Sequence, residues 1–209
     1  MSIIALQRAG HAVMAKPEQV LVTDGRRLRS ERSRQATIDA AVALTEEGVL
    51  VPTAQQIADR AGVGIRTFFR HFSDMETFFQ AVDDHIRDSY ESLFMGGDRR
   101  GTLDERIRGA VARHAAAYET VKNTILSTQA QLWRYQTLRR NYARSQRGLR
   151  RDLEDWLPEL RSVPGARREA VDAVASFEMW HRLRAQQGLS IAASTAIVAE
   201  LLTSLVGEH

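Results

Sequence analysis

A short basic and aromatic segment, residues 65–72, carries the side chains best suited to contact another molecule. It has the sequence IRTFFRHF. At about 3.6 residues per helical turn, Phe68 faces one side and Arg66, Phe69 and Arg70 face the other. Arginine presents a planar fork of donors that fits the paired acceptors of a guanine edge or a phosphate group. The segment therefore predicts contact with a nucleic acid.

Two helices joined by a tight turn are expected to position this segment. Thr53, followed by Gln56, forms a capping-box pattern that begins a helix extending to Ala61. Residues 62–64 read Gly-Val-Gly, and glycine can adopt turn conformations that other residues rarely reach. A second short helix then covers 65–72, as in a helix-turn-helix that places its second helix in a major groove about 12 Å wide. The predicted core of the pair is Ile57, Phe68, Phe72 and Phe79.

Most of the chain after residue 30 is predicted to be helical, because glycine and proline fall between the periodic segments. No stretch alternates polar and apolar residues over a useful length, so the fold class is all-α. The helix that follows the predicted DNA-contacting segment is expected to begin with a second capping box, Ser73 with Glu76. About nine helices are predicted, over residues 30–47, 53–61, 65–72, 73–94, 103–120, 121–134, 137–157, 166–187 and 190–206.

Arginines cluster just before the predicted helix-turn-helix. Arg29 and Arg32 are the two expected to contact DNA, either along the backbone or in a minor groove. Only Lys16 and Lys122 are lysines among 29 basic residues, a bias that a GC-rich genome explains without any function. An arginine-rich segment is also commonly a solvated tail, so its place beside the turn is what favours DNA.

Residues 53–76 strongly resemble the helix-turn-helix of the TetR family of bacterial regulators, and the similarity extends over about 32–86. The resemblance implies a homodimer that binds a palindromic double-stranded DNA operator, usually as a repressor, and leaves it when a small-molecule effector binds. By position, it assigns base contacts to Ile65, Arg66, Phe69 and Arg70, and phosphate contacts to Thr53, Thr67 and His71. The complete predicted DNA-binding set is Arg29, Arg32, Thr53, Gly64, Ile65, Arg66, Thr67, Phe69, Arg70 and His71.

Three positions depart from the family pattern. Phe69 replaces the usual tyrosine and lacks its hydroxyl group, and His71 stands where tyrosine is common. Met75 replaces a lysine that holds the DNA backbone, although the helix N-terminus there could still attract a phosphate. Weakened DNA binding in a helical dimeric scaffold or interaction protein is therefore the alternative to a regulator.

The sequence predicts three parts of the chain: a mobile arm (1–28), a helix-turn-helix domain (29–74) and a helical ligand-binding and dimerisation domain (75–209). A largely apolar ligand is expected among aromatic side chains, each of which could instead be ordinary core: His114, Tyr118, Trp133, Phe177 and Trp180. The last helix, 190–206, is apolar nearly all round. A partner subunit would cover it, unless it packs inside the monomer. The predicted dimer interface is Val198, Leu201, Leu202 and Leu205.

Composition and motifs argue against other classes of protein. The sequence contains no cysteine, so it has no disulfides or thiolate metal sites. It has no membrane-length apolar run and no secretory signal pattern, which predicts a cytoplasmic protein. His114 with Glu119, or Glu178 with His181, could pair as acid and base, but no nucleophile, phosphate-loop or metal motif accompanies them. We expect no catalysis, no cofactor and no metal.

Overall fold

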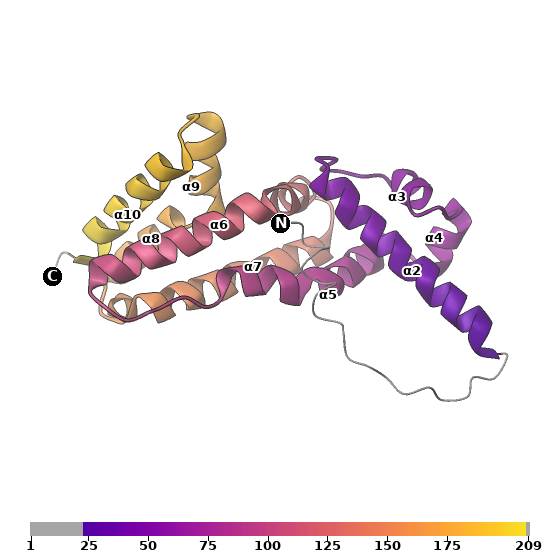
Figure 1. The fold of residues 1–209 in the computed structure, drawn as a ribbon, viewed down its shortest axis with the longest axis horizontal. Coiled ribbons are helices and arrows are strands. Elements are labelled where there is room, and N and C mark those ends of the chain that lie inside the picture. Colours follow the sequence, from indigo (N-terminus) through magenta and orange to yellow (C-terminus); the bar gives the residue numbers. More distant parts are fainter. Residues whose placement is uncertain (1–22, 208–209) are drawn as a thin grey trace. The chain divides into compact units, whose positions relative to one another are not determined.

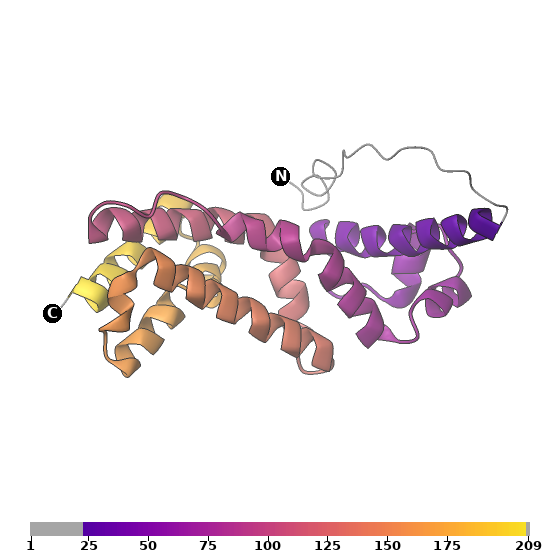
Figure 2. The same cartoon turned by 90° about the horizontal axis from the view of Figure 1, so that it is seen from below.

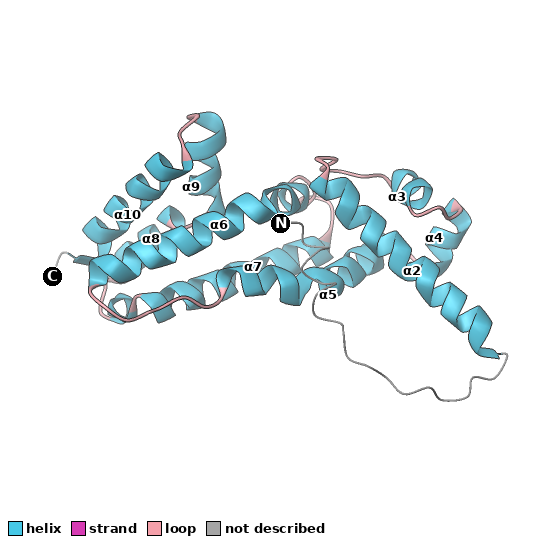
Figure 3. Ribbon diagram, in the orientation of Figure 1, coloured by secondary structure: helices cyan, strands magenta, loops and turns pink. Residues whose placement is uncertain are grey.

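The computed structural model describes residues 23–207. Within this range the chain forms nine α-helices, two short helices of other types and no strand (Figures 1 and 3). The all-α prediction is confirmed. The elements in chain order are α2 (Thr23–Glu46), α3 (Ala54–Arg60), α4 (Ile65–His71), α5 (Met75–Phe94), α6 (Leu103–Gln129), α7 (Gln136–Trp156), the 3-10 helix η1 (Pro158–Arg161), α8 (Gly165–Val174), α9 (Phe177–His181), the π-helix η2 (Arg182–Gln186) and α10 (Ile191–Gly207).

The described chain divides into two compact units. The first contains residues 23–90 and 121–143, and the second contains residues 91–120 and 144–207. This differs from the predicted boundary at residue 74. Most of α5, up to Tyr90, belongs with the helix-turn-helix, as do the end of α6 and the start of α7.

The core of the first unit is built on α2, α3, α4 and the start of α5. Phe68 and Phe72 are fully buried, as predicted, and both rings contact Phe78, with ring centroids 5.1 and 5.0 Å apart. The predicted core partner Phe79 is only partly buried: it packs against the edge of this core, and its ring also contacts Tyr135 at 4.8 Å. The ring at the centre is that of the preceding residue, Phe78, because a shift of one residue turns a helical side chain by about 100°.

The first helix begins earlier than predicted. α2 starts at Thr23, so residues 23–28 of the predicted arm are helical, and the rest of that arm lies outside the described residues. Gly25 suggested a break there. It is followed by twenty-one helical residues without proline, rich in arginine and alanine, which are good helix formers. Arg29 and Arg32 are therefore presented from a helix.

Capping explains where the short helices begin. The predicted box at α3 is present: the Gln56 amide donates to Thr53 Oγ1 at 3.2 Å, and the Thr53 amide donates to Gln56 Oε1 at 2.9 Å. The second predicted box was wrong. The α5 N-terminus is capped by Asp74, whose Oδ1 accepts from the Thr77 amide at 2.7 Å. Asp74 directly precedes the first helical residue, and its carboxylate therefore takes the capping position.

The core of the second unit joins the described parts of α6 and α7 to α8 and α10. Trp156 is its largest buried side chain and lies against the backbone at two glycines. A Cβ at Gly97 would lie 2.6 Å from the Trp156 ring, and a Cβ at Gly109 would lie 2.8 Å from it. Both positions therefore require glycine for this close approach of ring and backbone.

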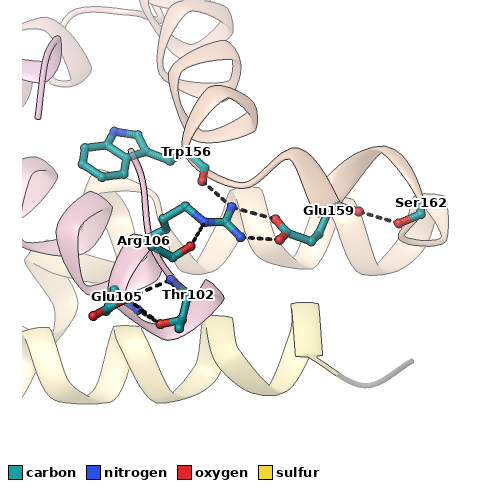
Figure 4. Close-up of polar contacts among 7 residues, drawn as sticks. Thr102, Glu105, Arg106, Trp156, Glu159 and Ser162 are labelled. Carbon is teal, nitrogen blue, oxygen red and sulfur yellow. Dashed lines mark hydrogen bonds and ion pairs between the residues drawn. The ribbon is translucent and has the colours of Figure 1, made fainter. Parts of the chain in front are cut away.

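Arg106 fixes the end of α7 to the start of α6 (Figure 4). Its Nη1 donates to the Trp156 carbonyl at 3.0 Å and to Glu159 Oε2 at 2.9 Å, and its Nη2 donates to the other carboxylate oxygen. This bidentate pair raises the pKa of Arg106 and lowers that of Glu159, mainly through the shared hydrogen bonds. Thr102 and Glu105 form a capping box at the N-terminus of α6.

Two predicted helix divisions were wrong in this half of the chain. The segments 103–120 and 121–134 form one helix, α6, since neither glycine nor proline interrupts the chain there. Conversely, 166–187 is divided into α8, α9 and η2. Ser176 causes the break, because its side chain caps α9 by accepting from the Met179 amide at 3.2 Å.

Candidate nucleic-acid interface

The turn between α3 and α4 contains two glycines, Gly62 and Gly64, and its backbone conformation requires glycine only at the first. Gly62 has φ +67, a left-handed conformation that favours glycine, and its amide donates to the Asp59 carbonyl at 3.1 Å. Gly64 is the N-cap of α4 and has an ordinary extended conformation, with φ −70 and ψ 148. A Cβ at Gly64 would meet nothing within 4 Å. The structure thus explains Gly62 by its conformation, while Gly64 is exposed at the start of α4 and free to lie close to another molecule.

The two faces of α4 differ sharply in exposure. Phe68 has 0% of its surface exposed, whereas the neighbouring Phe69 has 48% exposed. Arg66 and Arg70 are exposed on the same side as Phe69 and form no hydrogen bond or ion pair with any of residues 23–207. Their donors are available to an external acceptor. The other predicted contacts of this element vary: Thr53 is exposed, and Ile65, Thr67 and His71 are half-buried.

His71 is held against the first helix of the unit. Its Nε2 lies 2.7 Å from Ser33 Oγ, in a hydrogen bond whose direction depends on the imidazole tautomer. Burial lowers the pKa of His71, and the nearby positive charges of Arg70 and Arg34 lower it further. A neutral ring at pH 7 is the result. A phosphate contact from His71 would use Nδ1 or require Ser33 to give up its bond.

Arginines of α2 fall into two groups. Arg29 and Arg32 are exposed, while Arg34 packs its guanidinium over the Phe72 ring, 5.2 Å from the centroid. Arg34 also lies 3.8 Å from Glu31. Arg34 therefore belongs to the packing of the unit. The predicted contacts Arg29 and Arg32 are free to meet a backbone phosphate, and Arg26 and Arg27 of the same helix are exposed as well.

The N-terminus of α5 differs from the anion site expected there. Met75 is half-buried and packs on the core of the first unit. The Asp74 carboxylate accepts from the first-turn amide of Thr77, and these hydrogen bonds lower the pKa of Asp74. A negative charge already occupies the helix N-terminus, so its dipole offers little to a phosphate.

Exchanging Met75 for lysine is therefore expected to tighten binding to every DNA sequence alike. The lysine stem can keep the packing of methionine while its ammonium group reaches the surface. In a salt titration of DNA affinity, the slope should steepen by about one per subunit. Met75→Leu is the matched control and should leave the slope unchanged. An unchanged slope for Met75→Lys would mean that no phosphate lies near this position.

In the second unit, four of the five predicted ligand-binding residues come together. His114, Tyr118 and Trp180 line a small cavity of about 20 Å³ that is partly open to solvent, and Phe177 packs against Tyr118 at 5.6 Å. The enclosed part has room for only about one water molecule. Trp133 does not join this group, because it lies on a turn of the first unit with 80% of its surface exposed.

Polar partners of this cavity escaped sequence reasoning because they are distant along the chain. His114 Nε2 lies 3.0 Å from Asp152 Oδ2, and Asp152 Oδ1 accepts from Arg99 Nη2 at 2.5 Å. Glu119, considered as a partner of His114, instead accepts from Trp180 Nε1 at 2.9 Å. His114 and Glu119 therefore have separate partners.

The last helix fills the core of its own unit more than predicted. Val198 and Leu202 are buried within it, while Leu205 is partly buried and Leu201 is 37% exposed. Two residues of the predicted interface, Val198 and Leu202, lie on the face of α10 that packs into the core of their own unit. Of the four, Leu201 is the residue most accessible to a second subunit.

Among residues 23–207, no group of three or more histidine, cysteine or acidic side chains could hold a metal ion. No helix in that range is both long enough and apolar enough to cross a membrane.

Comparison with known proteins finds a family match within the first unit. Residues 38–82, from α2 to α5, match the family described as bacterial regulatory proteins, tetR family. The fold is similar to the crystal structure of a candidate transcriptional regulator from Streptomyces coelicolor A3(2), with a TM-score of 0.51 and 22% identity over 84% of this chain and 98% of that one. No curated protein matches the sequence.

Proposed function

Residues 38–82 match the tetR family of bacterial regulatory proteins, and on that match we propose that the chain is a TetR-type repressor whose homodimer binds a palindromic operator. Each subunit would place α4 in a major groove, with Arg66 and Arg70 toward guanine edges. The observation that carries the proposal is the contrast on α4 between two fully buried phenylalanines and two exposed, unengaged arginines, judged over residues 23–207.

The rigid attachment of α4 favours this function. Phe68 and Phe72 fix the orientation of the helix in the core, so its outer face is set before DNA arrives. Binding then orders a few long side chains and leaves the backbone unchanged, which limits the entropic cost of association. Thr53 at the N-cap of α3 and the exposed Arg29 and Arg32 would supply sequence-independent phosphate contacts around the site.

Release by a small, largely apolar effector is the second part of the proposal. The cavity beside His114 is lined mainly by alanine, valine, leucine and aromatic side chains. Because its enclosed space is about the size of one water molecule, an effector would have to separate the surrounding helices. Such a ligand binds an expanded state better than the packed one and shifts the population toward it.

Fluorescence anisotropy with DNA from upstream of the chain's own gene tests the DNA-binding part. We expect tight binding that a shuffled duplex of the same composition does not reproduce, with log affinity falling by about 0.9 per phosphate contact for each log unit of salt. Weak binding of equal strength to both duplexes would instead support a helical scaffold with a weakened motif.

Leu201→Arg is expected to convert the protein to monomers and to abolish cooperative operator binding. A charge placed on the exposed apolar edge of α10 would have to be desolvated in a dimer interface, which costs several kcal/mol (about 3–5) for an unpaired ion. Light scattering gives the mass directly. Thr203→Arg, at an exposed position on the same helix, is the control. A Leu201→Arg protein that is still dimeric would exclude this edge from the interface.

A further inference from the structure

We propose that the turn between α6 and α7 is a second DNA contact. In it, Trp133 and Arg134 bind the phosphate backbone of the DNA that flanks the operator bound by α4. This inference rests on the proposed DNA-binding function. It concerns residues outside the helix-turn-helix, about sixty positions along the chain from α4.

Trp133 is unusual in its exposure. Its surface is 80% exposed, whereas the other two tryptophans, Trp156 and Trp180, are buried. The turn that carries it is nevertheless firmly held: Arg139 Nη1 donates to the Leu132 carbonyl at 2.7 Å and to the Trp133 carbonyl at 3.3 Å. The indole is therefore presented in a fixed place, and little ordering would be required when it meets a partner.

The electrostatic surroundings of this turn select an anionic partner. Residues 120–151 contain no aspartate or glutamate. The basic residues of this stretch that belong to the first unit are Lys122, Arg134, Arg139 and Arg140. Arg134 is exposed and stacks over the Tyr135 ring at 5.2 Å, which orients its guanidinium. The indole N–H of Trp133 and the oriented guanidinium of Arg134 are both hydrogen-bond donors, and both can bind phosphate oxygens.

One acidic side chain does approach the turn, and it is already engaged. Glu76 of α5 accepts from the amides of Gln136 and Thr137, both at 2.8 Å. Burial opposes its ionisation, but these bonds at the α7 N-terminus outweigh burial and lower the pKa of Glu76. Its negative charge is balanced by the helix terminus and does not cancel the arginines.

The same contacts join the turn to the start of α5, the helix that follows α4, and the ribbon of Figure 2 shows the turn beside α5. Rings form a continuous path from α4 to the turn, with centroids 5.1 Å apart for Phe68 and Phe78, 5.8 Å for Phe78 and Phe79, and 4.8 Å for Phe79 and Tyr135. Arg140 Nη2 also donates to Gln80 Oε1 of α5 at 2.9 Å. The turn and α4 thus belong to one packed unit, and DNA held by α4 would be a polyanion on that same unit, which favours DNA over an acidic protein.

Quenching of tryptophan fluorescence by acrylamide tests the contact in the full-length protein. Two duplexes are compared. One, the trimmed duplex, contains the operator alone, and the other, the extended duplex, adds one helical turn, about 10 base pairs, at each end of the operator. We expect the extended duplex to protect Trp133 from acrylamide and the trimmed duplex to leave it accessible. The Trp133→Phe protein should lose this difference, because the remaining tryptophans, Trp156 and Trp180, are buried.

Arg134→Gln supplies an independent readout. On the extended duplex it should reduce the salt slope by about one per subunit, and on the trimmed duplex it should change nothing. Arg147→Gln, at an exposed position of α7 in the second unit, is the control.

The outcomes separate this inference from the proposed function. Normal binding of the trimmed duplex, with Trp133 equally quenched on both duplexes, would overturn the second contact and leave the regulator intact. Failure to bind either duplex would overturn both. Protection of Trp133 that grows with protein concentration in the absence of DNA would identify a self-association surface and also overturn the inference.

Discussion

Phe68→Ala is expected to lower the free energy of unfolding of the first unit by about 3–5 kcal/mol, the usual cost of truncating a buried phenylalanine. Its ring is completely buried and contacts Phe72 and Phe78, at 5.6 and 5.1 Å between centroids. The loss removes both the apolar burial and these ring contacts. Urea denaturation followed by circular dichroism measures the change.

The adjacent residue provides the control for this prediction. Phe69→Ala truncates the same side chain on the exposed face, where substitutions usually change stability by about 0.5 kcal/mol or less. Phe69→Ala should instead lower the affinity for DNA. Equal destabilisation by the two substitutions would mean that α4 does not separate a core face from a free face.

Arg66→Ala is expected to relax operator choice at one base pair, with a loss of about 1–3 kcal/mol there, or roughly 5- to 150-fold. The reason is that Arg66 lies on the exposed face of α4 with no hydrogen bond or ion pair to residues 23–207, so that its full set of donors can meet a guanine edge. Competition with operators altered at one base pair at a time measures the preference.

Arg66→Lys separates charge from shape. Lysine keeps the positive charge but lacks the planar fork, so it should restore much of the affinity and little of the base preference. If Arg66→Ala binds every altered operator with the same ranking as the unmodified protein, Arg66 contacts no base.

The helix-turn-helix could be predicted well because its signals are local. The Thr53–Gln56 box and the positive φ of Gly62 act over three or four residues, and the spacing of Phe68 and Phe72 defines the buried face directly. The sequence was less informative at the next helix. There two acceptors, Ser73 and Asp74, competed for one capping position, and only the structure shows that Glu76 serves the N-terminus of α7 instead.

The rest of the candidate sites depends on contacts between distant residues, which periodicity does not encode. By residue type alone, Trp133 cannot be distinguished from the buried aromatic residues, yet it follows the end of α6 and is exposed. The pairing of His114 with Asp152 joins positions 38 residues apart. In α10, apolar residues all round indicated a partner subunit, but Val198 and Leu202 are covered by the helices of their own unit.

Selection of bound sequences from a pool of randomised duplexes, using the full-length protein, tests the central claim most directly. The account predicts that the recovered sequences share two inverted half-sites, with centres about one helical turn, or a multiple of it, apart. Arg66→Ala should weaken the base preference at one position, equally in both half-sites. Recovery of sequences with no common motif, or of a single unrepeated half-site, would contradict binding of the operator by two copies of α4.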